Sequence, residues 1–303
     1  QELKERIASV VVGQEQTVDL VLTAILANGH VLIEGVPGVA KTLLARLTAR
    51  LIDADFSRIQ FTPDLMPSDV LGTTVFNMKT NGFDFHQGPI FADIVLVDEI
   101  NRAPAKTQAA LFEVMEERQI SIDGTTHRTG DLYTILATQN PVEQEGTYKL
   151  PEAQLDRFAI RLSLGYPDEE SEFRVLKDRY ETDPLDSLHP VLTCGEICDI
   201  RKEVCSVEVE DSLADYMMRL IRATREAPEI RLGASPRALL TLSRCAQSMA
   251  WLDNRGFIKP DDILALVHPL LAHRLVMTLE SKHAGIAPER VLDSIVRRLK
   301  IPV

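Results

Sequence analysis

The stretch Gly35-Val36-Pro37-Gly38-Val39-Ala40-Lys41-Thr42 governs how the rest of this chain is interpreted. It follows an apolar run at residues 31–33 and precedes residues 42–47, whose composition favours a helix. Backbone N–H groups in such a turn, and at the start of the following helix, point toward bound anions, and the helix dipole favours negative charge there. The order strand, glycine-bearing turn and helix therefore predicts a phosphate-binding loop in which every residue of the stretch contacts a nucleotide.

The last residues of this loop have side-chain roles in the prediction. The Lys41 ammonium can reach the β- and γ-phosphates, and the Thr42 hydroxyl can ligate Mg²⁺. The loop departs from the usual pattern at Ala40, because Gly normally precedes the Lys. Since Gly is favoured where the backbone takes a positive φ or approaches a ligand closely, the methyl group fits only if Ala40 has helical angles.

The composition indicates a soluble globular protein. The chain has 303 residues, 45% of them hydrophobic and 26% charged, which allows one large or two ordinary domains. The sequence has no apolar stretch long enough to cross a bilayer, and its polar start at residues 1–6 predicts no signal peptide, so a cytoplasmic location is expected. The net charge of −12 argues against a non-specific grip on nucleic acid, which needs clustered Lys and Arg.

The four cysteines are Cys194, Cys198, Cys205 and Cys245. Cys194 and Cys198 are spaced i, i+4, but there is no C-x-x-C pair and no His at ligand spacing in that stretch. A metal site or a disulfide stays open as an alternative. The preferred interpretation is buried free thiols in a reducing compartment.

Short apolar segments alternate with helical ones through the first half of the chain. Strands are expected at residues 30–34, 56–61, 93–97, 133–138 and 159–164. Helices are expected at residues 42–51 and 104–117, and over residues 1–29 with a turn at residues 10–14. This alternation predicts an α/β fold with a parallel sheet covered by helices on both faces.

Two further segments read as hairpins inserted between these core elements. Residues 73–87 alternate apolar and polar side chains around Asn81-Gly82, and residues 120–132 surround Asp123-Gly124. After residue 164 the pattern changes to a charged helical segment at 168–180 and then to helical periodicity, with few strand signals from residue 195. We expect a nucleotide-binding domain at 1–165 and a helical domain at 166–303, with a linker at about 166–190.

Polar residues end two of the predicted strands. Asp98 and Glu99 end the apolar run at residues 94–97, where Asp98 can hold Mg²⁺ and Glu99 can polarise an attacking water as a general base. Asn140 follows another apolar strand and can hydrogen-bond the γ-phosphate and that water. The alternative for each is a strand that simply ends in a polar turn.

Two arginines are also candidates for contacts with a nucleotide. Arg157 precedes the last predicted strand and can reach a neighbouring subunit's nucleotide, the alternative being a pair with Asp156 or solvent. Arg237 follows Ser235 and Pro236, which have the order of a helix cap and first residue. A cation in a helix's first turn opposes the helix dipole, which favours a role for Arg237 facing an anion.

Taken together, these motifs resemble those of AAA+ ATPases, and most closely those of the MoxR family. The resemblance covers essentially the whole chain, because six motifs occur in family order. They are residues 35–42, 88–91, 98–104, 137–141, 155–158 and 235–237.

The resemblance carries implications that the residues alone do not. It implies a sheet of order 5-1-4-3-2, a helical lid, and hairpins that correspond to the helix-2 insert and the insert before sensor 1. It makes Asn140 sensor 1, Arg157 the arginine finger and Arg237 the sensor-2 arginine, and it places the turn containing Val11 against adenine. ATP and Mg²⁺ would be the cofactors of a ring, expected to be a homo-hexamer. It would remodel or mature protein complexes or insert metal cofactors, with a von Willebrand factor A domain protein as partner.

Other functions stay open at this point. A magnesium-chelatase-type ATPase subunit shares the inserted hairpins. A DNA-handling ATPase is disfavoured by the net charge, and by His127 and Arg128 being too few to follow a phosphate backbone. A GTPase switch would leave the helical lid unexplained, and the sequence has no Asn-Lys-x-Asp segment to read guanine.

Overall fold

The computed structural model describes residues 2–11, 13–35, 41–140, 148, 150–165 and 188–302. Val36, Pro37, Gly38, Val39 and Ala40 of the predicted phosphate loop lie outside the described residues, as does the predicted helix at 168–180. By their internal contacts, the described residues form two compact units. The first lies within Gln1–Val18, His30–Leu150 and Leu162–Cys198, and the second within Asp19–Gly29, Pro151–Arg161 and Asp199–Val303.

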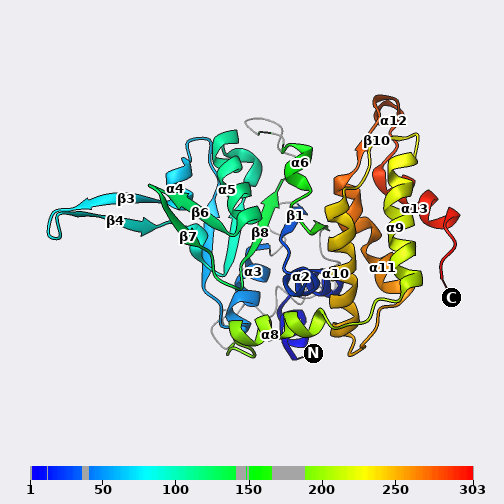
Figure 1. The fold of residues 1–303 in the computed structure, drawn as a ribbon, viewed down its shortest axis with the longest axis horizontal. Helices are drawn as coiled ribbons and strands as arrows, with labels where there is room; N and C mark the ends of the chain where they lie inside the picture. The colour runs from blue at the N-terminus through cyan, green and yellow to red at the C-terminus, as the bar shows by residue number, and fades with distance from the viewer. Residues whose placement is uncertain are drawn as a thin grey trace. The chain divides into compact units, whose positions relative to one another are not determined.

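A five-stranded sheet organises the first unit (Figure 1). Its strand order is β2-β5-β8-β1-β9, and the pairs β2–β5, β5–β8 and β1–β8 are parallel. If these five strands are numbered in chain order and the sheet is read from β9 to β2, the order is 5-1-4-3-2, which confirms the prediction. The strands are β1 (Val31–Gly35), β2 (Phe56–Gln60), β5 (Ile94–Asp98), β8 (Thr134–Gln139) and β9 (Ile160–Leu164).

The burial of the central strands explains why their sequences are mainly apolar and do not alternate between apolar and polar residues. Every residue of β5 is buried, and β8 is buried through Thr138. Since successive side chains of a strand point to opposite faces, both faces of the central strands are covered. Helix α3 (Lys41–Leu51) lies against β2 and β5 and buries Leu44, Leu47 and Leu51 at helical spacing.

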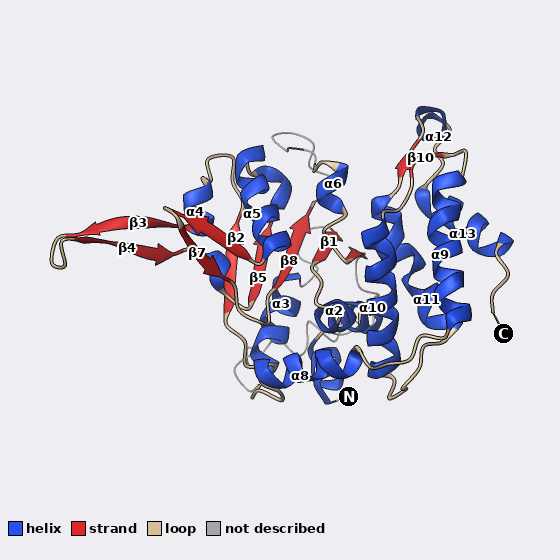
Figure 2. Cartoon of the chain, in the orientation of Figure 1, coloured by secondary structure: helices blue, strands red, loops and turns tan. Residues whose placement is uncertain are grey.

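The helical segments up to residue 204 are drawn in blue in Figure 2. Helix α5 begins at Ala105, one residue later than predicted, with Pro104 as its N-cap. The segments are α1 (Glu2–Val10), α2 (Glu15–Leu26), α3 (Lys41–Leu51), α4 (Pro67–Leu71), α5 (Ala105–Glu117), α6 (Glu152–Leu155), α8 (Cys194–Val204), and the 3₁₀ turns Pro89–Phe91 and Ile100–Arg102.

Both predicted hairpins are present, with shorter ladders or different turns. The first pairs β3 (Gly72–Asn77) with β4 (Gly82–Gln87), so its loop is residues 78–81 and Gly82 belongs to the strand. The second pairs β6 (Gln119–Ile122) with β7 (Thr125–Arg128) and ends before the predicted residue 132. Its turn is the expected one, because Asp123 and Gly124 both have positive φ (50° and 77°).

The second unit is mainly helical and confirms the predicted lid. Helix α9 buries Leu213, Met217, Leu220, Ile221 and Thr224 along one face, and it packs on α10 and α13. The helical segments are α9 (Asp211–Glu226), α10 (Pro236–Leu252), α11 (Pro260–Leu266), α12 (Leu279–His283), α13 (Pro288–Arg298), a π-helical turn at Val267–Leu271 and a 3₁₀ turn at Ala272–Arg274. A two-stranded ribbon, β10 (Ile230–Leu232) with β11 (Val276–Met277), was not predicted.

The cysteines correct one expectation. All four are free thiols, but only Cys245 is buried, and Cys205 is exposed. Burial raises the pKa of the Cys245 thiol to about 12, so this side chain acts as a small apolar residue of the helical core. No helix among the described residues is both long and apolar enough to span a membrane.

We expect Gly72→Ala to destabilise the fold more than Gly124→Ala. Both glycines have positive φ (102° and 77°), which costs an L-residue about 1 kcal/mol. At Gly72, a Cβ would also meet His86 O at 2.3 Å, whereas nothing lies within 4 Å at Gly124. Urea denaturation should show a loss of about 1 kcal/mol for Gly124→Ala and clearly more for Gly72→Ala. Equal losses would mean that the backbone contact at Gly72 costs nothing.

Candidate functional site

Lys41 opens helix α3, and its side chain turns back toward the strand that precedes the loop. Its Nζ donates a hydrogen bond to Gly35 O at 2.9 Å. Burial lowers the pKa of Lys41, while the negative charges of Asp98 and Glu99 act in the opposite direction. The predicted loop lysine and the two predicted acids therefore share one electrostatic environment, although they lie far apart in the sequence.

Asp98 is the last residue of β5 and is buried. Its Oδ1 accepts the Thr138 hydroxyl from β8 at 3.1 Å, and its Oδ2 accepts Arg58 Nε from β2 at 2.6 Å. A buried carboxylate needs such partners, because an isolated charge in the interior is strongly unfavourable. The neighbouring strands on both sides thus hold Asp98 in place.

Glu99 has a left-handed backbone, with φ 55° and ψ 50°. A non-glycine residue in this region costs free energy, and such outliers cluster at functional sites. The Glu99 N–H donates to Thr138 Oγ1 at 3.0 Å, so the same hydroxyl that contacts Asp98 also fixes the turn of the chain at Glu99. Because of this backbone conformation, the Glu99 side chain does not continue the alternating side-chain directions of β5.

Two polar side chains hold the Glu99 carboxylate. Gln60 Nε2, at the end of β2, donates to Glu99 Oε2 at 2.9 Å, and Arg102 forms an ion pair with the same oxygen at 3.0 Å. Sequence reasoning gave no role to Gln60, Arg102 or Thr138. Gln60 and Thr138 could have been found, because each lies at the carboxyl end of a predicted parallel strand, where polar side chains of neighbouring strands meet.

Parallel register explains why these residues converge. Gln60 pairs with Asp98, Val97 with Ala137, and Glu34 with Gln139, so the carboxyl ends of four strands lie at one edge of the sheet. Asn140 follows directly after β8 at this edge and is half-buried. Thr42 lies in the first turn of α3, beside Lys41.

The residues at this edge fit a bound Mg²⁺. The ion prefers hard oxygen ligands, and Asp98 offers a carboxylate while Thr42 offers a hydroxyl. The buried Asp98 carboxylate is held by the Arg58 guanidinium and the Thr138 hydroxyl, which fix its oxygens at this edge. Such an edge, with a lysine, a general base candidate and oxygen ligands, suits hydrolysis of a phosphoanhydride.

Arg157 and Arg237 both belong to the second unit, and Asp156 links their segments. Asp156 accepts hydrogen bonds from Ser235 Oγ at 2.9 and 3.1 Å and from Arg274 Nε at 2.9 Å. Ser235 caps α10 by accepting Ala238 N–H, Pro236 follows at the first helical position, and Arg237 comes next, as predicted. The segment that carries Arg157 is therefore bonded to the helix start that carries Arg237.

The buried side chain of Arg274 lies at the centre of this hydrogen-bonded cluster. Its side chain is 1% exposed, and it also donates to the backbone oxygens of Phe158 and Ala159. Sequence reasoning missed Arg274, because nothing in its local pattern distinguishes it from a surface arginine. Val11, predicted to lie against adenine, is buried at the end of α1 and donates its N–H to Ile7 O.

Comparisons with known proteins agree with this geometry. Residues 30–160 match the family of ATPases associated with various cellular activities (AAA), and residues 222–295 match the AAA lid domain. The chain is similar over its whole length to the crystal structure of a "putative ATPase" from Cytophaga hutchinsonii. The TM-score is 0.92 and the identity 40%, and the match covers 100% of this chain and 94% of that one.

Comparisons with individual related proteins identify the family of AAA ATPases more specifically. The chain is 46% identical to the uncharacterized protein YeaC of Bacillus subtilis, over 99% of this chain and 93% of that protein. It is 40% identical to chaperone MoxR1 of Mycobacterium tuberculosis, over 97% of this chain and 80% of that protein. It is 32% identical to protein MoxR of Methylorubrum extorquens, over 95% of this chain and 91% of that protein. The chain belongs to the MoxR family of AAA ATPases, as its motifs predicted.

We expect Arg274→Met to destabilise the second unit by roughly 3–5 kcal/mol, because it leaves Asp156 and two backbone carbonyls without their buried partner. The matched control is Arg231→Met, which removes an exposed 3.4 Å pair with Glu152 and should cost less than about 1 kcal/mol. Urea denaturation followed by circular dichroism measures both. Similar losses for the two variants would show that the Arg274 cluster is not a stability element.

Proposed function

We propose that this chain binds and hydrolyses ATP and couples the cycle to remodelling or maturation of protein complexes, as a chaperone. The observation that carries the proposal is the convergence of Lys41, Asp98 and Glu99 at the carboxyl edge of the sheet. Family membership supports ATP as the nucleotide. A relative that is 40% identical is named a chaperone, which supports the remodelling role.

The proposed roles follow from the chemistry of each group. Lys41 contacts the β- and γ-phosphates, together with the backbone of the loop Gly35, Val36, Pro37, Gly38, Val39 and Ala40, and Val11 lies against the adenine. Thr42 and Asp98 would hold Mg²⁺, which neutralises phosphate charge when bound. Glu99 acts as general base toward the attacking water, and Asn140 orients that water and the γ-phosphate.

The existing contacts of the Glu99 carboxylate constrain its role as general base. Its carboxylate is held by Gln60 and Arg102, so it must exchange at least one of these partners to accept a proton from water. A general base works only within hydrogen-bond reach of the proton it removes. The described geometry is therefore compatible with a resting site in which the base is held by the protein.

The proposal includes a ring, expected to be a homo-hexamer, and a partner with a von Willebrand factor A domain. Arg157 precedes β9, an edge strand of the sheet, and would act as the finger on a neighbouring subunit's γ-phosphate. Arg237 would act on its own subunit's nucleotide. The proposal also divides the chain into a nucleotide-binding domain at 1–165 and a lid at 166–303, and it places the protein in the cytoplasm.

We expect Lys41→Ala and Glu99→Gln to separate binding from hydrolysis. Lys41→Ala removes a charge-assisted contact to the ground-state phosphates and should weaken ATP affinity by about 10–100-fold. Glu99→Gln should leave affinity nearly intact and lower kcat by roughly 10²–10⁴-fold. Equilibrium binding of ATP and steady-state phosphate release measure the two effects. The control is Glu113→Gln, the same change on an exposed position of α5; wild-type turnover in Glu99→Gln would exclude Glu99 as the base.

We expect mixtures of Arg157→Ala and Lys41→Ala subunits to recover activity. Each variant alone should be nearly inactive, because an arginine finger contributes about 10³–10⁵ in rate where it acts. A mixed ring contains interfaces that join an intact loop to an intact finger. The measurement is a steady-state ATPase titration under subunit exchange, with co-assembly confirmed by pull-down. Mixtures that co-assemble but gain no activity would return Arg157 to a structural role.

A further inference from the structure

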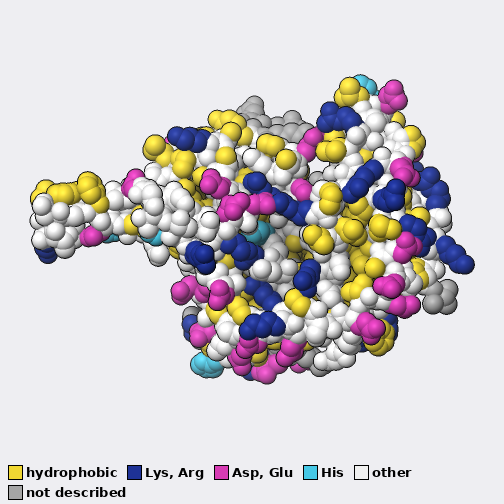
Figure 3. Space-filling view, in the orientation of Figure 1, with side chains coloured by type: hydrophobic (Ala, Val, Ile, Leu, Met, Phe, Trp, Pro, Cys, Tyr) yellow, Lys and Arg dark blue, Asp and Glu magenta, His cyan; other side chains and the backbone are white. Residues whose placement is uncertain are grey.

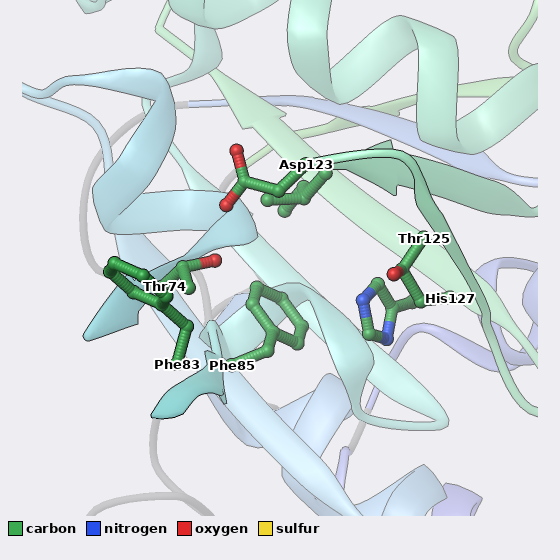
Figure 4. Close-up of a pocket in the computed structure, with 7 residues that line it drawn as sticks. Thr74, Phe83, Phe85, Asp123, Thr125 and His127 are labelled. Carbon is green, nitrogen blue, oxygen red and sulfur yellow. The ribbon is translucent and has the colours of Figure 1, made fainter. Parts of the chain in front are cut away.

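The two inserted hairpins enclose a pocket that the ATPase site does not use (Figure 4). It has a volume of about 630 Å³, within the range of ligand-binding pockets. The lining comes from β3, β4, β6, β7 and the turn between the last two. The lining residues are Thr74, Phe83, Phe85, Ile122, Asp123, Thr125 and His127.

Strand register accounts for the pocket. In an antiparallel pair, directly opposed residues share a face, so Thr74 lies on the same face as its partner Phe85. By the same rule, Ile122 shares a face with Thr125 on the second hairpin. The first hairpin therefore lines the cavity with a mainly aromatic face, and the second lines it with a face of apolar and polar side chains.

Two of the aromatic rings that line the pocket already pack against each other. The Phe85 ring lies 4.2 Å from the His127 ring, centroid to centroid, with 32° between the planes. Both rings also contact Phe91 edge-on, at 6.0 and 6.4 Å. These contacts join the two hairpins to each other and to the 3₁₀ turn at Pro89–Phe91, so a ligand meets a preorganised surface.

The lining has the chemistry of a cation site. Asp123 is its carboxylate, Figure 4 shows that side chain together with Phe83, Phe85 and His127, and no Lys or Arg is among the described residues that line the pocket. The faces of Phe83 and Phe85 carry partial negative charge and attract cations, while they also pack well against methylene chains. The chain's net charge of −12 steers basic partners toward it and acidic ones away.

Apolar surface continues from the pocket along the first hairpin. Phe83 is 74% exposed and packs edge-on against Phe76, which is 46% exposed, and Met78 in the loop is 89% exposed. Figure 3 shows hydrophobic side chains gathered toward the tip of this hairpin. Exposed apolar surface of this kind marks a contact with a macromolecule rather than with a small ion.

The hairpin edges favour an extended peptide as that macromolecule. Each hairpin is a two-stranded sheet, so its outer edges are not paired with any other described strand. Unpaired N–H and C=O groups at an edge can accept an added strand, and pockets beside the edge then select alternate side chains.

We propose that this pocket binds an Arg or Lys side chain within an extended segment of a protein partner. The cationic head lies toward Asp123, and the methylene stem lies on Phe83 and Phe85. The proposal rests on the remodelling function above and specifies the chemistry of its client. It assigns the hairpins the role of client contact, separate from the edge of the sheet that holds Lys41, Asp98 and Glu99.

The test compares short blocked peptides in which Thr and Val alternate around a central Arg, Lys, citrulline, Glu or Leu. Citrulline has nearly the shape of Arg but no charge. Fluorescence anisotropy with the full chain should show the Arg and Lys peptides binding about 5–10-fold more tightly than the citrulline peptide, and the Glu peptide most weakly. Equal affinity for Arg and citrulline, tightest binding of Leu, or no binding at all would overturn the proposal.

Variants localise the effect. Asp123→Asn should abolish the preference for Arg over citrulline, while the Asn-Gly turn preserves the left-handed backbone that Asp123 adopts. The matched control is Asp84→Asn, the same charge change on the opposite face of the first hairpin, and it should keep the preference. Phe83→Leu should weaken the Arg peptide several-fold with little loss of stability, because Phe83 and its ring partner Phe76 are both largely exposed. Equal effects of Asp123→Asn and Asp84→Asn would overturn the assignment to this pocket.

Two further readouts separate this proposal from its alternatives. Binding is measured without nucleotide, so a failure here leaves the Glu99→Gln result untouched, and a failure of ATP hydrolysis leaves the peptide result untouched. Sedimentation of Phe83→Leu against the native chain tests a second copy as the occupant. An assembly that loses mass in this variant would show that the hairpin meets another subunit, and would overturn the client assignment.

Discussion

The parallel register of β5 between β2 and β8 is the constraint on which the site depends. It brings the ends of three strands to one line, so that Thr138 from β8 and Arg58 from β2 both reach Asp98. A buried carboxylate is tolerated only with such partners. The polar end of an otherwise apolar strand is therefore stable because its neighbours are in register.

The same hydroxyl connects stability to chemistry. Thr138 donates to Asp98 and accepts the N–H of Glu99, whose left-handed backbone is thereby held. A strained conformation persists where surrounding contacts determine it. The cost of that conformation is offset by a hydrogen bond that also orders the metal-ligand candidate, which explains why two acidic residues in a row can take different roles.

The second unit uses an analogous arrangement around a cation. Arg274 is buried, and its donors are taken up by Asp156 and by the backbone after it, while Ser235 bonds Asp156 and caps α10. The segments that carry Arg157 and Arg237 are thus one hydrogen-bonded cluster. Separating the two segments would require breaking this buried ionic cluster, which is costly.

Much of this organisation was predicted from local pattern. Each apolar run at residues 94–97 or 134–138 is long enough for one buried strand, and the glycine-containing segment before Lys41 predicts an anion-binding loop. The Asp123-Gly124 turn was also predicted, since both residues favour positive φ. Asn81-Gly82 predicted the first hairpin but not its exact turn, because the register of β3 and β4 places Gly82 in the strand and the loop at residues 78–81.

Only the tertiary structure decided the partners. Gln60 and Arg102 hold Glu99, and Arg274 holds Asp156, through contacts between specific side chains that the local sequence does not pair. The pocket between the hairpins also required two separate ribbons to meet through Phe85 and His127. The sequence by itself determined the five strands of the sheet, most helices and the existence of both hairpins, because propensity and periodicity are local, but it did not predict the β10–β11 ribbon. Which polar groups become buried and paired depends on packing between distant segments, and that is set only when the chain folds.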